Sequence, residues 1–406
     1  MSLAPTAAVD ETSPRYAGWR VVFACFISAI FAWGFGFYGH SVYIAELHRV
    51  HGWPTSLVSG ATTAYYLLGG LLITFVSDVI AKVGPRNLLL VGMACYAVSM
   101  VLLAMAQSLW QLYGALLVMS FGWASMSLGA ISNILGLWFD ARRGMAISLA
   151  LNGASFSGVL IGPALVFLIA ASDFRTGLLI ATAAMLTIMT PIVVFCVGKP
   201  PRSTSSPPST TSAPVTPQWT RARALRSWKF WSICAPFAFA LLAQVGFLVH
   251  LISILEPNLG REQAGLALAV MSVMAVIGRV GLGAVIDRLN QRIVTAISLV
   301  TQALALLVVM HSNDPTVLFI AVAVFGLSVG NLITLPALIV QREFPSVSFG
   351  QIIALSTAIN QFTYALSPAL MGVVRDLTGG YAAVLAICMA AELSAAAIIL
   401  FRPKRV

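Results

Sequence analysis

The chain has 406 residues, of which 59% are hydrophobic and only 9% are charged. Soluble domains are roughly 45–50% apolar and about 25% charged, and single soluble cores stop growing near roughly 250–300 residues. This composition excludes a soluble globular enzyme, and it excludes a disordered chain, which requires low hydrophobicity and high charge. We therefore expect a polytopic helical membrane protein. The formal net charge of +10 allows a nucleic-acid partner or an asymmetric membrane topology, and the placement of the charges decides between them.

Twelve segments are apolar enough to form membrane-spanning helices, which need about 20 mostly apolar residues. In the first half of the chain they cover roughly residues 19–42, 56–77, 87–106, 110–137, 144–170 and 176–197. In the second half they cover roughly residues 228–255, 263–286, 293–310, 316–340, 350–373 and 381–401. These runs are too long for the strands of a membrane β-barrel, which alternate over about ten residues. The sequence predicts an all-α membrane protein with twelve transmembrane helices.

Lysine and arginine are distributed unevenly between the two sides of the predicted bundle. Most of the 23 lie in the termini and in the loops on the same side as the termini, whereas the opposite loops hold Arg49, Arg175, Arg261 and Arg375. The positive-inside rule then predicts a multi-pass protein of the inner or plasma membrane with both termini in the cytoplasm. This asymmetry explains the net charge, so we expect no nucleic-acid partner.

A change of composition separates the sixth predicted span from the seventh. Residues 199–218 consist mainly of Pro, Ser and Thr, which is typical of a flexible tether. The sequence therefore predicts a six-helix half over residues 1–197, a cytoplasmic linker over 198–227 and a second six-helix half over 228–406.

The two halves resemble each other, which indicates an internal repeat. The first span contains GFYGHSVYIAE and the seventh contains GFLVHLISILE. At a constant offset of 210 residues, five identities recur: Gly36, Phe37, His40, Ile44 and Glu46 match Gly246, Phe247, His250, Ile254 and Glu256. The repeat predicts two six-helix pseudo-repeats.

Parallel six-helix halves are the arrangement of the major facilitator superfamily, and the sequence resembles that superfamily over nearly its whole length. The loop after the eighth span carries the superfamily's signature. In the equivalent loop of the first half, Ala81 stands at the position where the signature has an Asp. Asp78, about one helical turn earlier, could take the role of that Asp. The resemblance implies a cytoplasmic gate that holds the halves together in the outward-open state. Its members are Asp78, Lys82, Arg86, Asp287, Arg288 and Arg292. The alternative is that these charges serve topology alone.

Four further segments resemble bacterial relatives of monocarboxylate transporters and oxalate–formate antiporters. They are GWRVV from Gly18, GW at 52–53, WFDARRGMA over 138–146 and GRVGLGAVIDR over 278–288. This resemblance implies a secondary active transporter of a small organic anion that works by alternating access with a proton as the coupling ion. The alternatives with the same fold are an exporter of drugs or metabolites and an anion exchanger.

A sensor or a membrane-embedded enzyme is a further alternative of a different class. The only sizeable soluble stretch is the linker, which argues against a sensor with an output domain. The sequence contains no phosphate-binding G-x-x-x-x-G-K-[ST] motif, so we expect no ATPase. The sequence thus predicts no enzymatic activity and no cofactor.

Arg279 is the one lysine or arginine that lies well inside a predicted span rather than at its end. A charge at the centre of a membrane helix costs about 2.5–3.5 kcal/mol on insertion scales, so such residues usually face a cavity or a partner. A guanidinium binds a carboxylate through two parallel hydrogen bonds. The resemblance to monocarboxylate transporters implies the same role, whereas the alternative is a structural arginine paired with a neighbouring helix. Ala275, one turn earlier, stands where the animal members of that family have an Asp.

His40 and His250 occupy equivalent positions of the repeat, in spans that face each other across the cavity in this superfamily. When the sequences are aligned through Ser41, the preceding His40 falls on a lysine that animal monocarboxylate transporters use for protonation. Histidine exchanges a proton near neutral pH, so both are candidate substrate contacts and candidate proton-coupling groups. The alternative for each is a packing histidine held by hydrogen bonds. Two histidines without a third ligand do not predict a metal site.

Three other polar residues within predicted spans are candidate functional groups. Glu392 is a candidate proton-coupling group, because intramembrane acids often relay protons; its span is usually peripheral in the superfamily, so pairing with a polar neighbour is the alternative. Gln244 and Asn331 are candidate substrate ligands, because their spans line the cavity in the superfamily. Hydrogen bonding between helices is the alternative for both.

Small residues in two later spans predict close helix contacts. They are Gly326 and Gly330 in the tenth span, and Gly278, Gly281 and Gly283 in the eighth.

Overall fold

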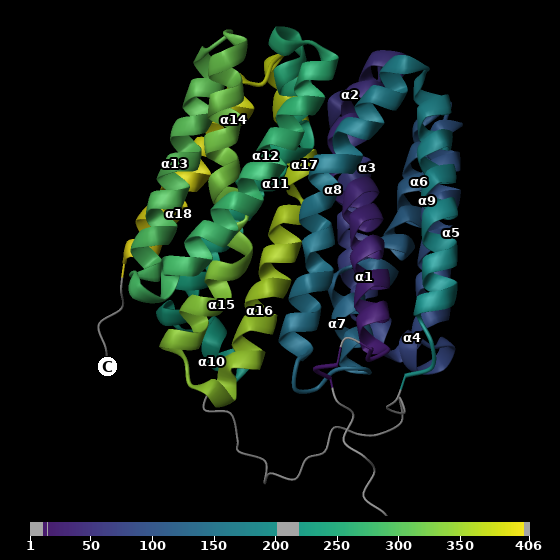
Figure 1. Ribbon diagram of the computed structural model, residues 1–406. Coiled ribbons are helices and arrows are strands. Elements are labelled where there is room, and N and C mark those ends of the chain that lie inside the picture. The colour runs from purple at the N-terminus through teal and green to yellow at the C-terminus, as the bar shows by residue number, and fades with distance from the viewer. Residues whose placement is uncertain (1–10, 14, 201–218, 402–406) are drawn as a thin grey trace, which may run out of the picture.

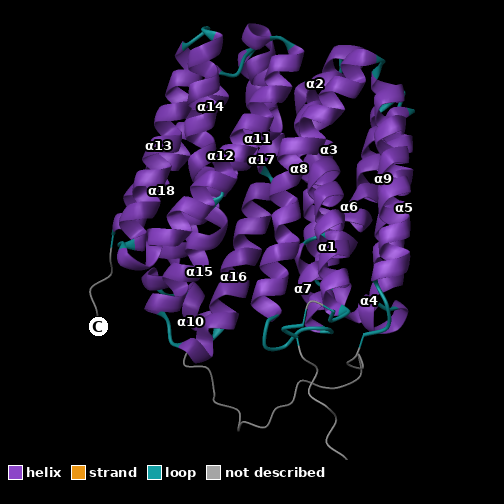
Figure 2. Cartoon of the chain, in the orientation of Figure 1, coloured by secondary structure: helices purple, strands orange, loops and turns teal. Residues whose placement is uncertain are grey.

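The computed structural model describes residues 11–13, 15–200 and 219–401, and this part of the chain is helical without any strand (Figures 1 and 2). The first half contains α1 (Gly18–Trp33), the π-helix η1 (Gly34–Tyr38), α2 (Gly39–His51), α3 (Thr55–Ile73), α4 (Val76–Val83), α5 (Pro85–Ala104), α6 (Leu109–Met126), α7 (Leu128–Gly136), α8 (Arg143–Ala171) and α9 (Phe174–Cys196).

The second half repeats this pattern of long and broken helices. It contains α10 (Arg221–Leu225), α11 (Trp228–Leu259), α12 (Arg261–Val285), the 3₁₀-helix η2 (Ile286–Arg288), α13 (Gln291–His311), α14 (Pro315–Val329), α15 (Asn331–Glu343), α16 (Ser346–Ala365), α17 (Ser367–Thr378) and α18 (Ala382–Leu400).

All twelve predicted spans fall on helices, and eleven helical segments of the described residues are long and apolar enough to cross a membrane. The difference concerns residues 350–373, which the structure divides at Leu366 into α16 and α17. Pro368 lies at the start of α17, where its missing N–H and fixed φ suit a first helical turn better than a helix interior. The two shorter helices together supply the remaining span.

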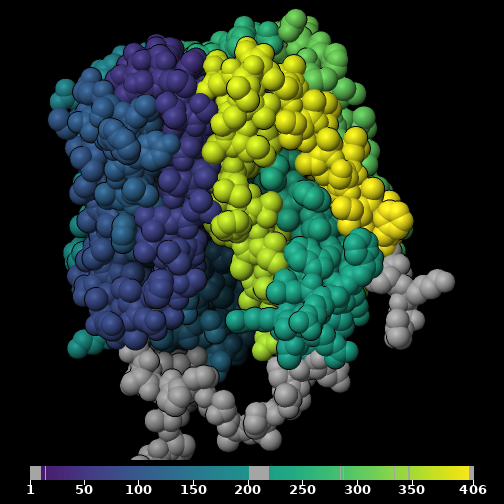
Figure 3. Space-filling view, turned by 180° about the vertical axis from the view of Figure 1, so that it is seen from behind, coloured from purple at the N-terminus to yellow at the C-terminus, as the bar shows by residue number. Residues whose placement is uncertain are grey.

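The two halves lie side by side (Figures 1 and 3). α1 begins and α18 ends at the same end of the bundle, where α9 also ends and α11 begins (Figure 1). We call this the linker end and the opposite end the distal end. Within the first half α1 packs on α8 and α5 on α6, while within the second α12 packs on α14 and α13 on α18. Between the halves, α8 packs on α12, α3 on α17 and α2 on α11.

Glycines allow α12 and α14 to cross closely. A Cβ on Gly278 of α12 would collide with the carbonyl oxygen of Leu327, and one on Gly326 of α14 would collide with the carbonyl oxygen of Met271. Gly330 likewise faces the carbonyl oxygen of Ala275. The prediction of close helix contacts is therefore confirmed at these three glycines.

The same prediction is wrong at Gly281 and Gly283, because a Cβ added at either residue would meet nothing within 4 Å. Both glycines lie beyond the point where α14 crosses α12.

Most of the predicted linker, residues 201–218, lies outside the described residues. Its last part is structured: Trp219 packs on Phe344 with ring centroids 4.9 Å apart, and its backbone N–H donates to Ser348 Oγ. This contact holds residues 219–227, including α10, against the second half.

Candidate functional site

Arg279 lies on α12 where the two halves meet. Its Nε donates to the carbonyl oxygen of Gly330 (3.3 Å), and its Nη1 donates to Ser155 Oγ of α8 (3.2 Å). Among the described residues no carboxylate forms an ion pair with it. A partly exposed guanidinium that has only neutral partners keeps its charge available for an anion.

Three more side chains lie along the same contact between the halves. Gly158, one turn after Ser155 on α8, leaves room for Ser272 of α12 and for Tyr38: a Cβ there would collide with Ser272 Oγ and would lie 2.7 Å from Tyr38 Cζ. Tyr38 ends η1, and π-helical turns occur frequently at functional sites. We call Arg279, Ser155, Ser272 and Tyr38 the Arg279 site.

Sequence reasoning missed Ser155, Ser272 and Tyr38. The only signal near Tyr38 is the glycine-rich run GFGFYG over 34–39, which permits the irregular turn. The two serines carry no signal of their own, because serine is common in membrane helices and its partner depends on where the helices cross.

His40 is fully buried on α2 and has one unsatisfied ring nitrogen. Its Nδ1 lies 3.2 Å from Thr62 Oγ1, and its ring centroid lies 4.7 Å from that of Tyr65 and 5.5 Å from that of Tyr66. Its Nε2 has no hydrogen-bond partner among the described residues. Buried polar atoms are rarely left unpaired. This nitrogen can therefore still bind a proton or form a hydrogen bond with a ligand.

His250 is also fully buried, but both of its ring nitrogens have partners. Nδ1 lies 3.3 Å from the hydroxyl of Tyr381, and Nε2 lies 3.3 Å from the carbonyl oxygen of Pro368. The two histidine-bearing helices touch, since the backbone N–H of Ile252 donates to Ser41 Oγ (3.0 Å). The symmetry of the sequence therefore does not extend to the surroundings of the two histidines.

The two predicted amide ligands are buried in the second half. Asn331 begins α15, next to the Gly330 carbonyl that Arg279 contacts, and its Nδ2 donates to the carbonyl oxygen of Leu327 (3.2 Å). Gln244 lies on α11, and its Oε1 has no partner among the described residues. Asn331 thus neighbours the Arg279 site in the chain, whereas among the described residues no hydrogen bond joins Gln244 to Arg279.

Glu392 lies on α18 and is fully buried, with neither carboxylate oxygen paired among the described residues. Its helix packs against α11 and α13, all within the second half. Gln302 of α13 is likewise buried with both amide atoms unpaired in the described part of the chain. Glu392 is therefore separated from the contact between the halves.

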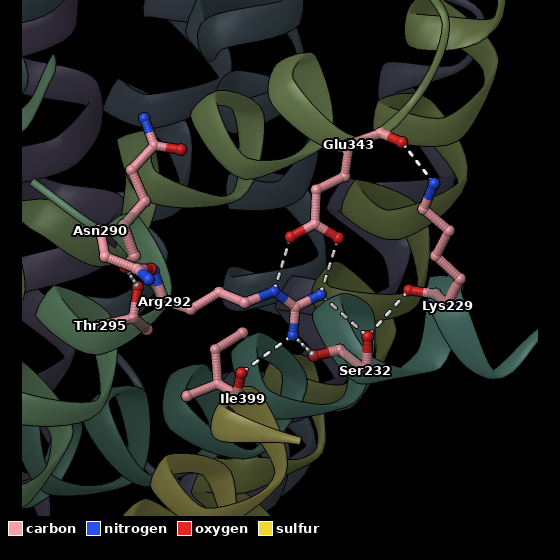
Figure 4. A network of polar contacts seen from close by, with 8 residues as sticks. Lys229, Ser232, Asn290, Arg292, Thr295, Glu343 and Ile399 are labelled. Atoms are coloured by element: carbon pink, nitrogen blue, oxygen red, sulfur yellow. Dashed lines mark hydrogen bonds and ion pairs between the residues drawn. The ribbon is translucent and has the colours of Figure 1, made fainter. Parts of the chain in front are cut away.

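The residues of the predicted gate lie at the linker end. Asp78, Lys82, Arg86 and Arg288 are exposed, and the side chain of Asp287 lies outside the described ones. Arg292 is buried and forms a two-pronged ion pair with Glu343, with Nε–Oε1 at 2.7 Å and Nη2–Oε2 at 2.9 Å (Figure 4).

Every other partner of the Arg292 side chain also belongs to the second half. Its Nη1 donates to the carbonyl oxygen of Ile399 (2.9 Å), and its Nη2 donates to Ser232 Oγ (3.0 Å), as Figure 4 shows. In this conformation Arg292 ties α11, α13, α15 and α18 together and does not join the halves. A gate in the opposite conformation stays a prediction.

Three further polar contacts between the halves lie at the distal end. Glu46 of α2 pairs with Arg261 of α12, with Oε1 and Nη2 2.6 Å apart. The backbone N–H of Ser56 on α3 donates to Asp376 Oδ2 of α17 (2.7 Å). Arg375 Nη2 lies 3.3 Å from His48 Nε2. We call these three contacts the distal latch.

Twelve spans in two packed halves with a site between them define a membrane transporter. The family model of the Major Facilitator Superfamily matches residues 21–257 and 249–406. The chain belongs to this superfamily, and the predicted class, fold and absence of an enzymatic role are confirmed with it.

Three curated relatives are similar over most of their length. An uncharacterised MFS-type transporter, YcxA of Bacillus subtilis, is 22% identical over 93% of both chains. Monocarboxylate transporter 11 of Mus musculus is 26% identical over 87% of this chain and 78% of its own, and monocarboxylate transporter 13 of Bos taurus is 25% identical over 95% and 89%. The predicted resemblance to monocarboxylate transporters is confirmed.

Proposed function

We propose that this protein is a secondary active transporter of a small organic anion of the monocarboxylate type. The observation that carries the proposal is the guanidinium of Arg279, which lies inside the membrane span at the contact between the halves and has only neutral partners among the described residues. A carboxylate would supply the missing counter-charge through two parallel hydrogen bonds. The relatives named monocarboxylate transporters support the same substrate class.

The halves alternate between two arrangements in this proposal. The distal latch joins α2, α3, α12 and α17 across the halves, whereas the charged loops at the linker end pair within one half or stay exposed. The structure then corresponds to the arrangement closed at the distal end. Opening requires the latch to break and the loops of the predicted gate to meet.

Proton coupling through His40 is the second part of the proposal. A monocarboxylate anion and a proton cross together without net charge, and a proton gradient drives the uptake. His40 has a buried ring nitrogen without a partner, while both nitrogens of His250 are engaged. His40 is therefore the proposed proton carrier, with His250 as a packing residue.

The proposed location is the inner or plasma membrane, with the linker end and both termini in the cytoplasm. Support comes from the charges, because the basic residues concentrate in the termini and loops at this end. The distal latch would then face the outside.

Uptake into proteoliposomes tests the proposal. Labelled monocarboxylates, dicarboxylates and a lipophilic cation are offered with and without an inward proton gradient. We expect the proton gradient to stimulate the uptake of monocarboxylates. We expect no such stimulation when the pH is held equal on both sides of the membrane. Exchange of anions without net uptake would identify an exchanger, and movement of the cation alone would identify a drug exporter; either result contradicts the proposal.

A further inference from the structure

Hydrogen-bond donors without partners gather around one turn of α3, where the first half meets α16 of the second half. The hydroxyl of Tyr66 on α3, the Nε1 of Trp123 on α6 and the Nε2 of Gln361 on α16 are buried atoms without a hydrogen-bond partner among the described residues. Both α6 and α16 pack on α3. We call these three groups the donor cluster.

Two glycines bring the donors together. Gly69 and Gly70 follow Tyr66 by three and four residues on α3, so they lie on the same face of the helix. A Cβ on Gly69 would lie 3.7 Å from Trp123 Nε1, and one on Gly70 would lie 3.5 Å from Gln361 Nε2. Both nitrogens therefore lie against the face of α3 that carries Tyr66.

The chemistry of the donor cluster calls for an acceptor. The Oε1 of Gln361 already accepts a hydrogen bond from the Tyr364 hydroxyl. The indole of Trp123 and the amide nitrogen of Gln361 can only donate, and buried donors are rarely left unpaired. All three groups of the cluster are uncharged, whereas a buried carboxylate needs a charged partner. The ligand that suits them therefore brings a neutral oxygen.

Aromatic rings connect the donor cluster to the Arg279 site. The ring of Phe37 lies 5.3 Å from that of Tyr38, a member of the Arg279 site, and 6.3 Å from that of Tyr66. Phe37 and Trp33, one turn earlier, are both partly exposed. Their rings are therefore available to a flat apolar ligand, because aromatic side chains stack on other rings.

We propose that the transported anion is an aromatic monocarboxylate with a neutral oxygen on its ring, at the end remote from the carboxylate. Arg279 holds the carboxylate, the rings of Trp33 and Phe37 lie against the aromatic body, and the donor cluster binds the oxygen. This inference rests on the proposed function, because it assigns the far end of the same substrate site. The donor cluster then selects among monocarboxylates, while Arg279 selects the charge.

Binding of matched ligands to the purified full chain, measured by calorimetry at one pH, tests this selection. The probes are phenylpropionate and para-hydroxyphenylpropionate, which differ only in the oxygen on the ring. We expect the hydroxylated acid to bind about two- to tenfold more tightly for each neutral hydrogen bond that it gains. Equal affinities for the two acids would overturn the inference.

Removal of a donor should weaken the preference without affecting the parent acid. Tyr66→Phe and, separately, Gln361→Leu are expected to lower the affinity for para-hydroxyphenylpropionate by about two- to tenfold and to leave that for phenylpropionate unchanged. Tyr43→Phe is the matched control, because it removes a buried tyrosine hydroxyl that already contacts Met100 Sδ. A preference that survives fully in both Tyr66→Phe and Gln361→Leu, or that Tyr43→Phe lowers equally, would overturn the inference.

Two further ligands separate this inference from the proposed function. Tighter binding of the dicarboxylate para-carboxyphenylpropionate than of the hydroxylated acid would show that a charge holds the far end. That charge would be a proton on His40, whose ring lies 5.5 Å from that of Tyr66, and the inference would be overturned. Binding of acetate without either aromatic acid would also overturn it but would leave the anion site at Arg279 intact. If no monocarboxylate binds, the proposed function falls as well.

Discussion

His40 and Glu392 are both buried groups with unpaired atoms, but they lie in different parts of the molecule. His40 is on α2, which packs against α11 of the other half, whereas Glu392 is enclosed within the second half. In the proposed mechanism, only the first position lies where movement of the halves would change its surroundings. This difference at the level of single residues leads to the first prediction.

We predict that His40→Gln reduces proton-driven uptake while exchange at equal pH is better preserved. Glutamine keeps a polar group near Thr62 but cannot carry a proton. The measurement compares uptake under an inward proton gradient with counterflow at equal pH. His250→Gln and Glu392→Gln are the controls, and loss of the gradient response in Glu392→Gln alone would place the proton on α18 and contradict the proposal.

His48 contributes to the distal latch through its ring nitrogens. Its Nδ1 lies 2.7 Å from the carbonyl oxygen of Trp53, and its Nε2 lies 3.3 Å from Nη2 of Arg375. The first contact needs a proton on Nδ1, so Nε2 accepts from Arg375 only while the ring is neutral. Protonation would turn an N–H toward the guanidinium and repel it.

The neighbouring carboxylate behaves differently. Partial burial acts to raise the pKa of Asp376, but hydrogen bonds from Ser56 and the charge of Arg375 hold that pKa below its usual value. A depressed pKa keeps the carboxylate charged down to strongly acidic pH, so its contact with Ser56 is lost only there.

We predict that His48→Leu, which removes the acceptor for Arg375, loosens the distal latch. Spin labels on Val50→Cys of α2 and Leu377→Cys of α17, both at exposed positions, would report the distance between the halves in a background without the native cysteines. Longer distances are expected in His48→Leu than in the protein that retains His48. Equal distances in the two proteins would show that the contact between His48 and Arg375 does not hold the halves together.

The sequence identifies Arg279, an unusual residue for a membrane span, but it does not identify the residues that contact Arg279. Arg279 stands out because a charge in an apolar span needs an explanation. Ser155 and Tyr38 do not stand out, because they come from other helices and acquire meaning only through the helix crossing at Gly158. The histidine pair shows the opposite error, since equal sequence positions acquire different hydrogen bonds.

At the scale of helices, the crossing of α12 and α14 holds Arg279 in place. Gly278 immediately precedes it and faces the backbone of Leu327, while Gly281 faces open space. The sequence shows both glycines at helical spacing, but it does not show where α14 crosses. The break of the eleventh span at Leu366 follows the same rule, because Pro368 allows a break without fixing its place.

These two glycines make a matched pair. Gly278→Ala is expected to destabilise the protein by about 1–3 kcal/mol through overpacking, and Gly281→Ala is expected to be neutral or to stabilise by up to about 1 kcal/mol through helix propensity. Apparent melting temperatures in detergent provide the comparison. Equal temperatures for both variants would mean that the backbones at Gly278 separate without penalty.

At the scale of the whole molecule, the two-half architecture is predictable from the apolar runs and the repeat, whereas the conformation is not. The distal latch joins Glu46 to Arg261 and Ser56 to Asp376, residues from helices far apart in the chain. Composition does not indicate which of two arrangements of the halves is occupied.

We predict that covalent closure of the distal end stops transport. Glu46→Cys and Arg261→Cys, joined by a short thiol-cleavable reagent, would hold α2 to α12. Net uptake should cease and should return after reduction. The control joins Glu46→Cys to Arg49→Cys within α2, where the same reagent bridges one turn and should leave uptake unchanged. Continued uptake with the halves joined would rule out alternating access at this end.

The most direct test of the central claim is the affinity of the purified protein for a transported monocarboxylate before and after Arg279→Lys. Lysine keeps the positive charge but loses the planar fork that grips both carboxylate oxygens, so we predict that the affinity falls by at least tenfold while folding and expression are retained. An Arg279→Lys protein that binds and transports the anion like the wild type would show that Arg279 only joins α8 to α14, and the assignment of the anion site would be wrong.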